Sequence, residues 1–280
     1  MSTLGFKTSP QHTTWEAIQT VWREADQIEL IDHAWLFDHF APIQGDVSGP
    51  CLEGWTALAA LAVETKRLRL GLMVTGNTYR HPAVLAKIAA TVDVISNGRL
   101  DFGVGAGWNV YEHESMGIPL YKPGERIRRF GEACEIWKRL FTEPTVDFDG
   151  RYYQLEEARC EPKPVQKPHP PFVIGGGGEQ LTLRVVAKYA DIWNHGGNLE
   201  EFARKVGILR EHCAEVGRDP DEITLSWQLR PQLDNLGAAV EDIKRFQEAG
   251  ATHFVMVLPT PHEAGVATRI ADEVIARVKG

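Results

Sequence analysis

Short apolar runs and stretches with helical periodicity alternate along the whole chain. In the first periodic stretch, Trp15, Ile18 and Val21 recur at helical spacing after Thr13-Thr14, a pair suited to begin a helix that runs to about Ile28. The apolar runs are short and rich in β-branched and aromatic residues, which favours strands. We predict eight strands, at Leu4–Lys7, Ala34–Phe37, Leu68–Val74, Leu100–Val104, Phe172–Ile174, Ile192–Asn194, Thr224–Leu229 and His253–Leu258.

A helix is predicted after each of these strands. Two connections are longer than a simple βα unit needs: a polar, glycine-rich loop over 40–54, and a loop over 105–124 with about one helical turn. A hairpin is predicted around Asp149-Gly150, and the proline-rich crossing over 162–171 cannot be helical. The later helices are predicted at Trp55–Glu64, Pro82–Ile95, Glu125–Phe141, Gln180–Tyr189, Glu200–Val216, Ala238–Ala249 and Pro261–Val278.

Eight β-then-α units without a linker or a change of composition predict a closed barrel of parallel strands. The length of 280 residues is close to the ~250 that such a barrel uses. An open dinucleotide-binding sheet needs its glycine fingerprint after the first strand, where Lys7-Thr8-Ser9-Pro10 stands instead. We therefore predict an α/β fold, a (β/α)8 TIM barrel with insertions after strands 2 and 4, formed by residues 1–280 as a single domain.

Charge and composition exclude several classes of protein. A net charge of −8 argues against a nucleic-acid surface, which needs a basic face. No run approaches the ~20 apolar residues of a membrane span, and residues 1–11 do not resemble a signal peptide. The four cysteines are scattered without a CxxC pair, and no HxH or HxxxH spacing occurs, so no disulfide framework and no metal site is expected. We expect a cytoplasmic protein that binds neither nucleic acid nor a membrane.

The ends of the strands are the places to look for chemistry in such a barrel. Asp38-His39 follows the second strand, and an imidazole can act as acid or base near neutral pH. We therefore select His39 and Asp38 as candidate catalytic residues. The alternative is a histidine that merely ties down the loop with Asp38 as its partner, and the sequence leaves both interpretations open.

The third strand is followed by the small and polar run Met73-Val74-Thr75-Gly76-Asn77-Thr78. The fourth is followed by Gly103-Val104-Gly105-Ala106-Gly107-Trp108-Asn109, with three alternating glycines. Small residues let a planar ligand approach the backbone, and the threonine and asparagine can supply hydrogen bonds. Ordinary βα loops and tightly packed glycines explain the same pattern.

Gly175, Gly176, Gly177 and Gly178 form the most specific local feature, because they lie between a predicted strand and a predicted helix. Uncovered amides and the positive end of a helix dipole converge there, which is typical of a phosphate site. A purely structural turn needs only one or two glycines. The position is nearer the middle of the chain than the phosphate site of many barrels.

The remaining candidates are weaker. Glu112, His113 and Glu114 are interpreted as a solvated run of charges rather than a metal cluster. Four tryptophans near strand ends could line a flat ligand: Trp55, Trp108, Trp193 and Trp227. The chain contains no GxSxG, CxxC or P-loop lysine, so hydrolase, thiol-redox and nucleotide-triphosphatase functions lack their motifs.

Several longer motifs together resemble the luciferase-like flavin and deazaflavin oxidoreductases, and more narrowly the branch that uses the deazaflavin coenzyme F420. They are LFDHF at 36–40, GPCLEGWTALAALA at 49–62, RLRLGLMVTGNTYRHPAVLAK at 67–87, ISNGRLDFGVGAGWN at 95–109 and PPFVIGGGGEQLTLRVVAKYADIWN at 170–194. The resemblance runs from near the N-terminus to about residue 230.

The resemblance implies a (β/α)8 barrel with the cofactor ring at its C-terminal mouth. It implies that the ring rests on a bulge at Leu72–Thr75 that commonly contains a non-prolyl cis peptide, and that His39 lies beside the reactive carbon. It also implies that Gly107-Trp108-Asn109 and Gly175–Gly178 hold the ribityl-phosphate arm. Trp108 stands where the sugar-phosphate dehydrogenases of the family have a glutamate, which argues against glucose 6-phosphate as substrate.

On this basis we expect hydride transfer between F420 and a small organic substrate, an electron-poor double bond or an alcohol/carbonyl pair, with His39 moving the proton. One alternative is an FMN-dependent monooxygenase of the same superfamily, and another is a non-catalytic flavin or ligand carrier. A homodimer is usual in the family and is expected here.

Overall fold

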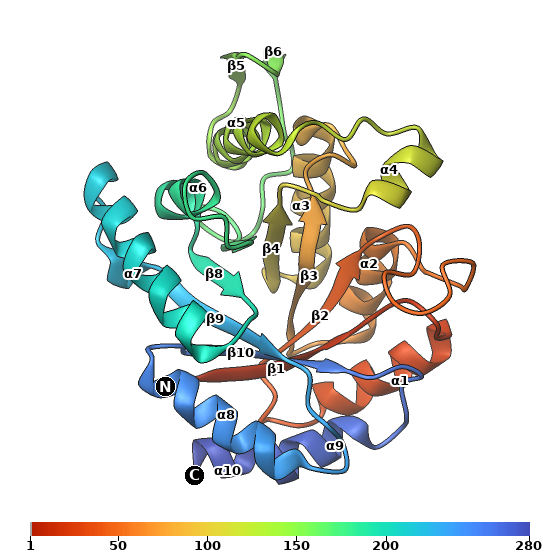
Figure 1. Ribbon diagram of the computed structural model, residues 1–280. Coiled ribbons are helices and arrows are strands. Elements are labelled where there is room, and N and C mark those ends of the chain that lie inside the picture. The colour runs from red at the N-terminus through yellow and green to blue at the C-terminus, as the bar shows by residue number, and fades with distance from the viewer. Residues whose placement is uncertain (1) are drawn as a thin grey trace.

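Eight parallel strands close into a barrel in the computed structural model, which describes residues 2–280 (Figure 1). The strand order is β1-β10-β9-β8-β7-β4-β3-β2, and β1 closes the ring by pairing with both β2 and β10. The predicted (β/α)8 barrel is confirmed. Its strands are β1 (Thr3–Thr8), β2 (His33–Asp38), β3 (Arg69–Gly76), β4 (Leu100–Gly105), β7 (Phe172–Gly175), β8 (Ile192–His195), β9 (Thr224–Leu229) and β10 (His253–Leu258).

The helices surround this barrel and begin where the local sequence supplies a cap. Thr14 accepts a hydrogen bond from the amide of Ala17 at the start of α1, and His81 caps α3 next to Pro82. The helices are α1 (Trp15–Asp26), α2 (Gly54–Glu64), α3 (Pro82–Ser96), α4 (Val110–Met116), α5 (Pro123–Thr142), α6 (Thr182–Tyr189), α7 (Leu199–Val216), α8 (Leu236–Glu248), α9 (Val266–Ile270) and α10 (Ala276–Lys279). None of the helices within residues 2–280 combines the length and apolar character that crossing a membrane requires.

Alternation along the strands divides the side chains between two layers. In β1, Leu4 and Phe6 pack outward with the helices, whereas Lys7 lies on the interior side. Inside the barrel, side chains from four different strands form a small apolar cluster of Trp35, Met73, Val173 and Val255. The apolar interior thus lies beneath the mouth formed by the C-terminal strand ends.

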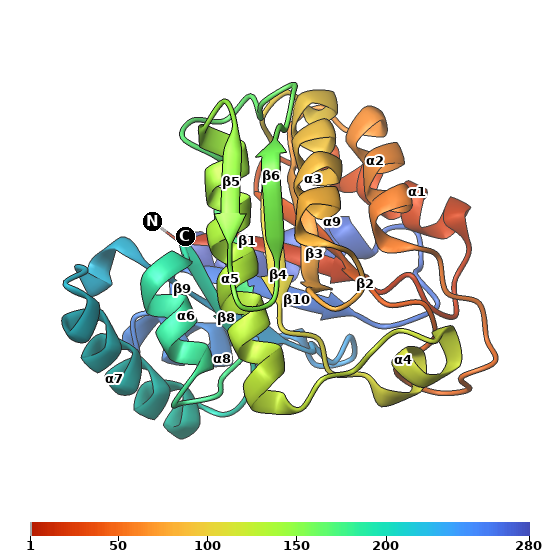
Figure 2. The same cartoon turned by 90° about the horizontal axis from the view of Figure 1, so that it is seen from above.

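The chain leaves the barrel between β4 and β7. It forms α4, α5 and a hairpin of β5 (Val146–Asp149) and β6 (Gln154–Ala158), as predicted around Asp149-Gly150. Figure 2 shows this hairpin lying over α5 on the outside of the barrel. A proline-containing crossing then returns the chain to β7. The insertion therefore places α4 at the rim of the mouth, while the turn of the hairpin reaches the loop after β3, where Asn77 donates to the Tyr153 hydroxyl at 3.2 Å.

The last predicted helix, Pro261–Val278, is wrong at its start and in its middle. Gly265 has a φ of 83° and α9 begins only after it, while residues Ala271–Ile275 form a π-helical turn. The carboxylate of Glu24 on α1 accepts hydrogen bonds from the amides of Gly265 and Thr268. This cap comes from a residue more than 200 positions away, so the local sequence could not predict it.

Candidate active site

A cavity of about 560 Å³ opens at the C-terminal mouth of the barrel. Nine of the predicted site residues line it: Asp38, His39, Met73, Val74, Gly107, Trp108, Gly175, Gly176 and Gly177. Thr75, Asn109 and Gly178 are not among the lining residues. The barrel has therefore brought together residues from four strand ends, β2, β3, β4 and β7, as expected for a site at this face.

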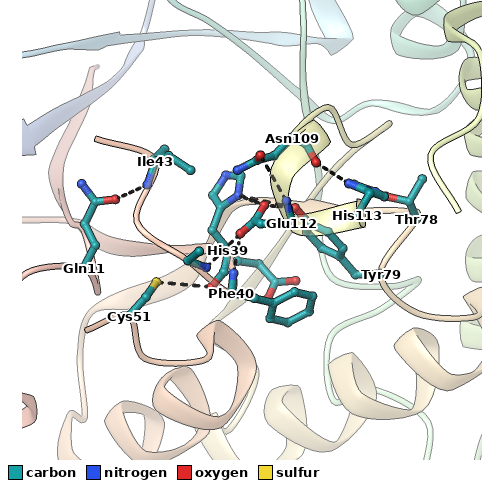
Figure 3. A network of polar contacts seen from close by, with 12 residues as sticks. Gln11, His39, Phe40, Ile43, Cys51, Thr78, Tyr79, Asn109, Glu112 and His113 are labelled. Carbon is teal, nitrogen blue, oxygen red and sulfur yellow. Dashed lines mark hydrogen bonds and ion pairs between the residues drawn. The ribbon is translucent and has the colours of Figure 1, made fainter. Parts of the chain in front are cut away.

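His39 lies at the edge of this cavity with its ring held by Glu112 of α4 (Figure 3). The Nδ1 atom of His39 is 2.8 Å from Oε2 of Glu112. A carboxylate can only accept, so Nδ1 carries the hydrogen and donates it. The Nε2 atom is then the ring nitrogen available to a ligand in the cavity.

The Glu112 carboxylate is completely buried, and four groups donate hydrogen bonds to it. Besides His39, the hydroxyl of Tyr79 donates to Oε2 at 2.5 Å, and the amides of Phe40 and Ala41 donate to Oε1 at 2.5 and 3.1 Å. Burial alone would raise the pKa of Glu112, but the hydrogen bonds from His39 and Tyr79 outweigh it and hold the pKa below its ordinary value. The carboxylate therefore stays charged beside His39.

Our interpretation of Glu112-His113-Glu114 as a solvated run of charges is wrong for its first two residues. Glu112 and His113 are 0% and 1% exposed, and only Glu114 faces solvent. The Nδ1 atom of His113 donates to the Asn109 carbonyl, and its Nε2 accepts from the Thr78 hydroxyl at 2.7 Å, so this imidazole fastens α4 to the mouth. Asn109 also caps α4 by accepting from the amide of Glu112, which explains why it faces the helix rather than the cavity.

Asp38 belongs to a second buried ionic group. Arg80 donates to its two carboxylate oxygens, at 2.5 Å and 3.1 Å, and also contacts Glu53, the residue before α2. Burial raises the pKa of Asp38, while the Arg80 guanidinium opposes that shift. The geometry gives Asp38 a defined structural partner in addition to its place at the wall of the cavity.

The floor of the cavity is the expected irregularity in β3. Its pairing with β4 shifts between Gly71 and Thr75, and the Met73–Val74 peptide is cis and not prolyl. Met73 and Val74 line the cavity, whereas Thr75 is buried and accepts a hydrogen bond from the indole of Trp55 at 3.0 Å. The bulge that the resemblance implies is therefore present.

The glycine segment Gly175–Gly178 crosses the opposite side of the cavity. A Cβ atom built on Gly177 would lie 2.5 Å from Nζ of Lys205 and 2.6 Å from Cε1 of His195, so only glycine fits without displacing them. Within residues 2–280 the amides of Gly177 and Gly178 have no hydrogen-bond acceptor. Lys205 is 8% exposed and is paired with Glu201 at 2.7 Å. The segment thus offers free amides beside a buried ammonium, a combination suited to a phosphate.

The start of the helix after the glycines and the positions of three of the four tryptophans differ from what the sequence predicts. The helix after the glycines begins at Thr182 rather than at Gln180, and Glu179 precedes it in an ion pair with Arg204. Of the four tryptophans near strand ends, Trp108 is 59% exposed and lines the cavity. Trp55, Trp193 and Trp227 are buried in the core, and Trp227 stacks on Phe246.

Comparison with known proteins adds four findings. The sequence profile of the luciferase-like monooxygenases matches residues 3–274. An uncharacterized protein of Mycobacterium tuberculosis is 31% identical over 224 residues, which cover 78% of this chain and 76% of that protein. An F420-dependent glucose-6-phosphate dehydrogenase of Amycolatopsis mediterranei is 33% identical over 192 residues, 68% of this chain and 55% of the dehydrogenase. The solved structure of an F420-dependent secondary alcohol dehydrogenase in complex with an F420-acetone adduct is 20% identical. It has a TM-score of 0.85 over 100% of this chain and 99% of that chain, which shows the same fold.

Proposed function

Because this chain belongs to the luciferase-like monooxygenase family, we propose that it is an oxidoreductase that transfers hydride between coenzyme F420 and a small organic substrate. One observation carries this proposal: the His39–Glu112 pair, the β3 bulge and the glycine segment all border one cavity. The relative named as an F420-dependent glucose-6-phosphate dehydrogenase supports the choice of cofactor.

The residues present fit the cofactor. Met73 and Val74 provide an apolar floor for a flat ring. Gly177 at the cavity wall, with Gly178 and Lys205 directly behind it, provides a phosphate cradle that a Cβ would fill. Gly107 and Trp108 form the wall between the floor and the outside. When bound, F420 supplies or accepts the hydride, which the protein's own side chains cannot do.

The protein's own contribution is to move one proton and to hold the reactants. Nε2 of His39 is placed to give a proton to the substrate atom next to the carbon that receives hydride, or to take it in the opposite direction. The buried charge of Glu112 fixes the tautomer of His39 and stabilises the imidazolium when it forms. Asp38, held by Arg80, fixes the backbone just before His39 and so positions its ring. The substrate itself is a carbonyl, imine, activated alkene or alcohol.

Parallel titrations of the protein with F420 and with FMN test the cofactor, with tryptophan fluorescence as the readout. Trp108 lines the cavity and is expected to report binding, so a Trp108→Phe variant serves as the optical control. We expect tighter binding of F420. Binding of FMN that is tighter by at least tenfold, about 1.4 kcal/mol, would overturn the proposal in favour of an FMN-dependent monooxygenase.

Turnover separates an enzyme from a carrier. The F420-loaded protein is offered alcohols, and the reduced form is offered carbonyl compounds and activated alkenes, while the absorbance of F420 is followed. We expect a change in absorbance with at least one of these substrate classes. Tight binding of F420 without turnover of any of them would support a carrier instead.

A further inference from the structure

The proposed function leaves one half of the barrel mouth unused. Lys7 is the last but one residue of β1, Gln228 is the last but one residue of β9, and Arg230 follows β9 directly. These three residues border the central cavity and also an adjoining cavity of about 570 Å³. The adjoining cavity is lined by Gly196 and Gly197 but by none of Gly175–Gly178, so it is a separate lobe from the phosphate cradle.

Within the part of the chain that the structure describes, Lys7 is a buried cation that forms no ion pair. It is 8% exposed, and its Nζ donates to the Oε1 of Gln228 at 3.1 Å. Lys205 provides the contrast, since it is equally buried but is paired with the carboxylate of Glu201. Buried ammonium groups are normally paired, because losing water without a counter-charge is costly. The positive charge of Lys7 is therefore not balanced by a negative charge within residues 2–280.

Arg230 adds a second positive charge to the same place. Its guanidinium donates to the side-chain oxygen of Gln44 at 3.2 Å, and neither Arg230 nor Lys7 forms an ion pair within residues 2–280. The carboxylates that line the two cavities have cationic partners of their own: Asp38 is engaged by Arg80, and Asp242, in the wall of the adjoining cavity, lies 3.9 Å from Arg245. Burial and the charge of Arg230 together lower the pKa of Lys7 to about 8, so an anion placed between them would relieve both effects.

We propose that Lys7 and Arg230 bind an oxyanion of the substrate, a carboxylate or a phosphate, and so place its reacting carbon beside His39. The proposal rests on the proposed function, since it assigns the substrate class of the same site. β1 lies next to β2, which His39 follows directly, whereas the glycine segment starts at the end of β7, on another side of the barrel. An anion in the lobe of Lys7 and an anion in the glycine cradle can therefore be bound together. An ammonium and a guanidinium are the groups proteins use to bind both carboxylates and phosphates.

Calorimetric titration of the F420-loaded protein with three probes tests this assignment. The probes are malonate as the carboxylate, inorganic phosphate, and malonamide as the uncharged counterpart of malonate. Loading with F420 occupies the glycine cradle first, so that it does not compete for the anions. We expect one of the two anions to bind at least tenfold more tightly than malonamide, and the tighter anion identifies the substrate group. Equal binding of malonamide, or binding of neither anion, would overturn the proposal.

Three variants locate the site. Lys7→Met and Arg230→Gln are expected to weaken the anion by about tenfold or more, because each removes a charge-assisted hydrogen bond. Lys7→Arg keeps the charge and is expected to retain anion binding within a few-fold. The affinity for F420 stays unchanged in all three. Arg230 is exposed, so its variant keeps the fold even if a Lys7 variant does not. Unchanged anion affinity in Arg230→Gln and Lys7→Met would overturn the proposal.

The failure of the proposed function has a different signature. If F420 does not bind to the wild-type protein, that result alone overturns the proposed function. The same anion titrations are then made on the unloaded protein in the Gly177→Val background, which blocks the glycine cradle. A loss of affinity on removal of Lys7 or Arg230 there still supports the anion site, and no loss overturns it.

Discussion

The two halves of the barrel mouth, one formed by β2 and β3 and the other by β1 and β9, differ in whether their charged side chains have partners within the protein. On the side of β2 and β3, the Glu112 carboxylate accepts hydrogen bonds from His39 and from backbone amides, and Asp38 is paired with Arg80. On the side of β1 and β9, the ammonium of Lys7 has only the side-chain oxygen of Gln228 as its hydrogen-bond partner among residues 2–280. In the first half the charged groups find their partners when the chain folds, and in the second half Lys7 does not.

The difference indicates which groups orient and which groups bind. A charged network that is satisfied within the protein holds a side chain in one place, and it gains nothing from a ligand. A buried charge without a counter-ion destabilises the free protein and gains free energy when an anion arrives. We therefore expect changes on the first half to reduce turnover, and changes on the second half to alter stability and substrate binding.

The largest expected effect tests the satisfied half. His39→Ala removes the proposed proton-transfer group, and we expect the turnover number to fall by roughly 10²- to 10⁴-fold. The affinity for F420 changes little, because the floor and the phosphate cradle remain. Turnover and F420 titration of wild type and variant provide the measurement. A lower melting temperature with normal turnover would show that His39 only ties down its loop.

The Glu112→Gln variant tests how much of the turnover depends on the hydrogen-bond partner of His39. The neutral amide no longer stabilises the imidazolium, and its NH₂ group faces donors from Tyr79 and Phe40. By analogy with the carboxylates that orient metal-binding histidines, we expect turnover to fall by about 100-fold. Glu114→Gln, on the exposed face of the same helix, is the matched control and keeps wild-type turnover. Equal turnover in both variants would remove Glu112 from the mechanism.

Lys7→Met tests the unsatisfied half through the stability of the free protein. In the folded protein Lys7 has a pKa of about 8, below the value of 10.5 that applies when it is unfolded. Between these pH values the unfolded chain binds more protons, so the free energy of unfolding of the wild type rises with pH. By linkage the rise is roughly 2 kcal/mol from about pH 8 to about pH 10.

Urea unfolding at the two pH values measures this rise. Lys7→Met lacks the titrating group, so its difference from the wild type shrinks as the pH rises. Lys205→Met, which removes an ion-paired ammonium, serves as the control and keeps the wild-type rise. The same pH dependence in Lys7→Met and the wild type would show that Lys7 is not held as an unpaired cation.

The smallest expected effect concerns the phosphate cradle. Gly177→Val pushes Lys205 and His195 away and covers the free amides, so we expect the affinity for F420 to fall about tenfold, or 1.4 kcal/mol. A fragment of F420 without the phosphate is expected to bind both proteins equally. Gly207→Val on α7, where an added Cβ meets nothing within 4 Å, is the control for stability in urea. Equal loss for the fragment would mean that the glycines serve packing.

The fold was predictable because its information is local and repeated. Each barrel strand is a short apolar run, and most helices begin at a cap or a proline that can be identified within four residues. The exceptions depend on distant contacts. The start of α9 depends on the carboxylate of Glu24 in α1. No residue close to α9 in the sequence indicates this contact.

The site was predictable where residues end a strand, as with His39 and the glycines. Glu112 was missed because it stands between other polar residues in the sequence. Such a run does not show which residue lies on the buried face of the helix. Asn109 followed three residues later by Glu112 is a helix-start signature, and it indicates the helical phase that turns Glu112 inward. Lys7 carried a signal as well, since a lysine closing the apolar strand Leu4–Lys7 has no neighbouring carboxylate.

The short helix α4 has a consequence for how this protein can evolve. Within one insertion, Trp108 lines the cavity, and four residues later Glu112 holds the imidazole of His39, the proposed proton-transfer group. Exchanging this segment for that of a relative would alter pocket shape and proton transfer in a single step. New specificities are therefore more accessible by point substitutions around 229–237, the segment between β9 and α8 that lines the adjoining cavity, than by recombination of the β4 insertion.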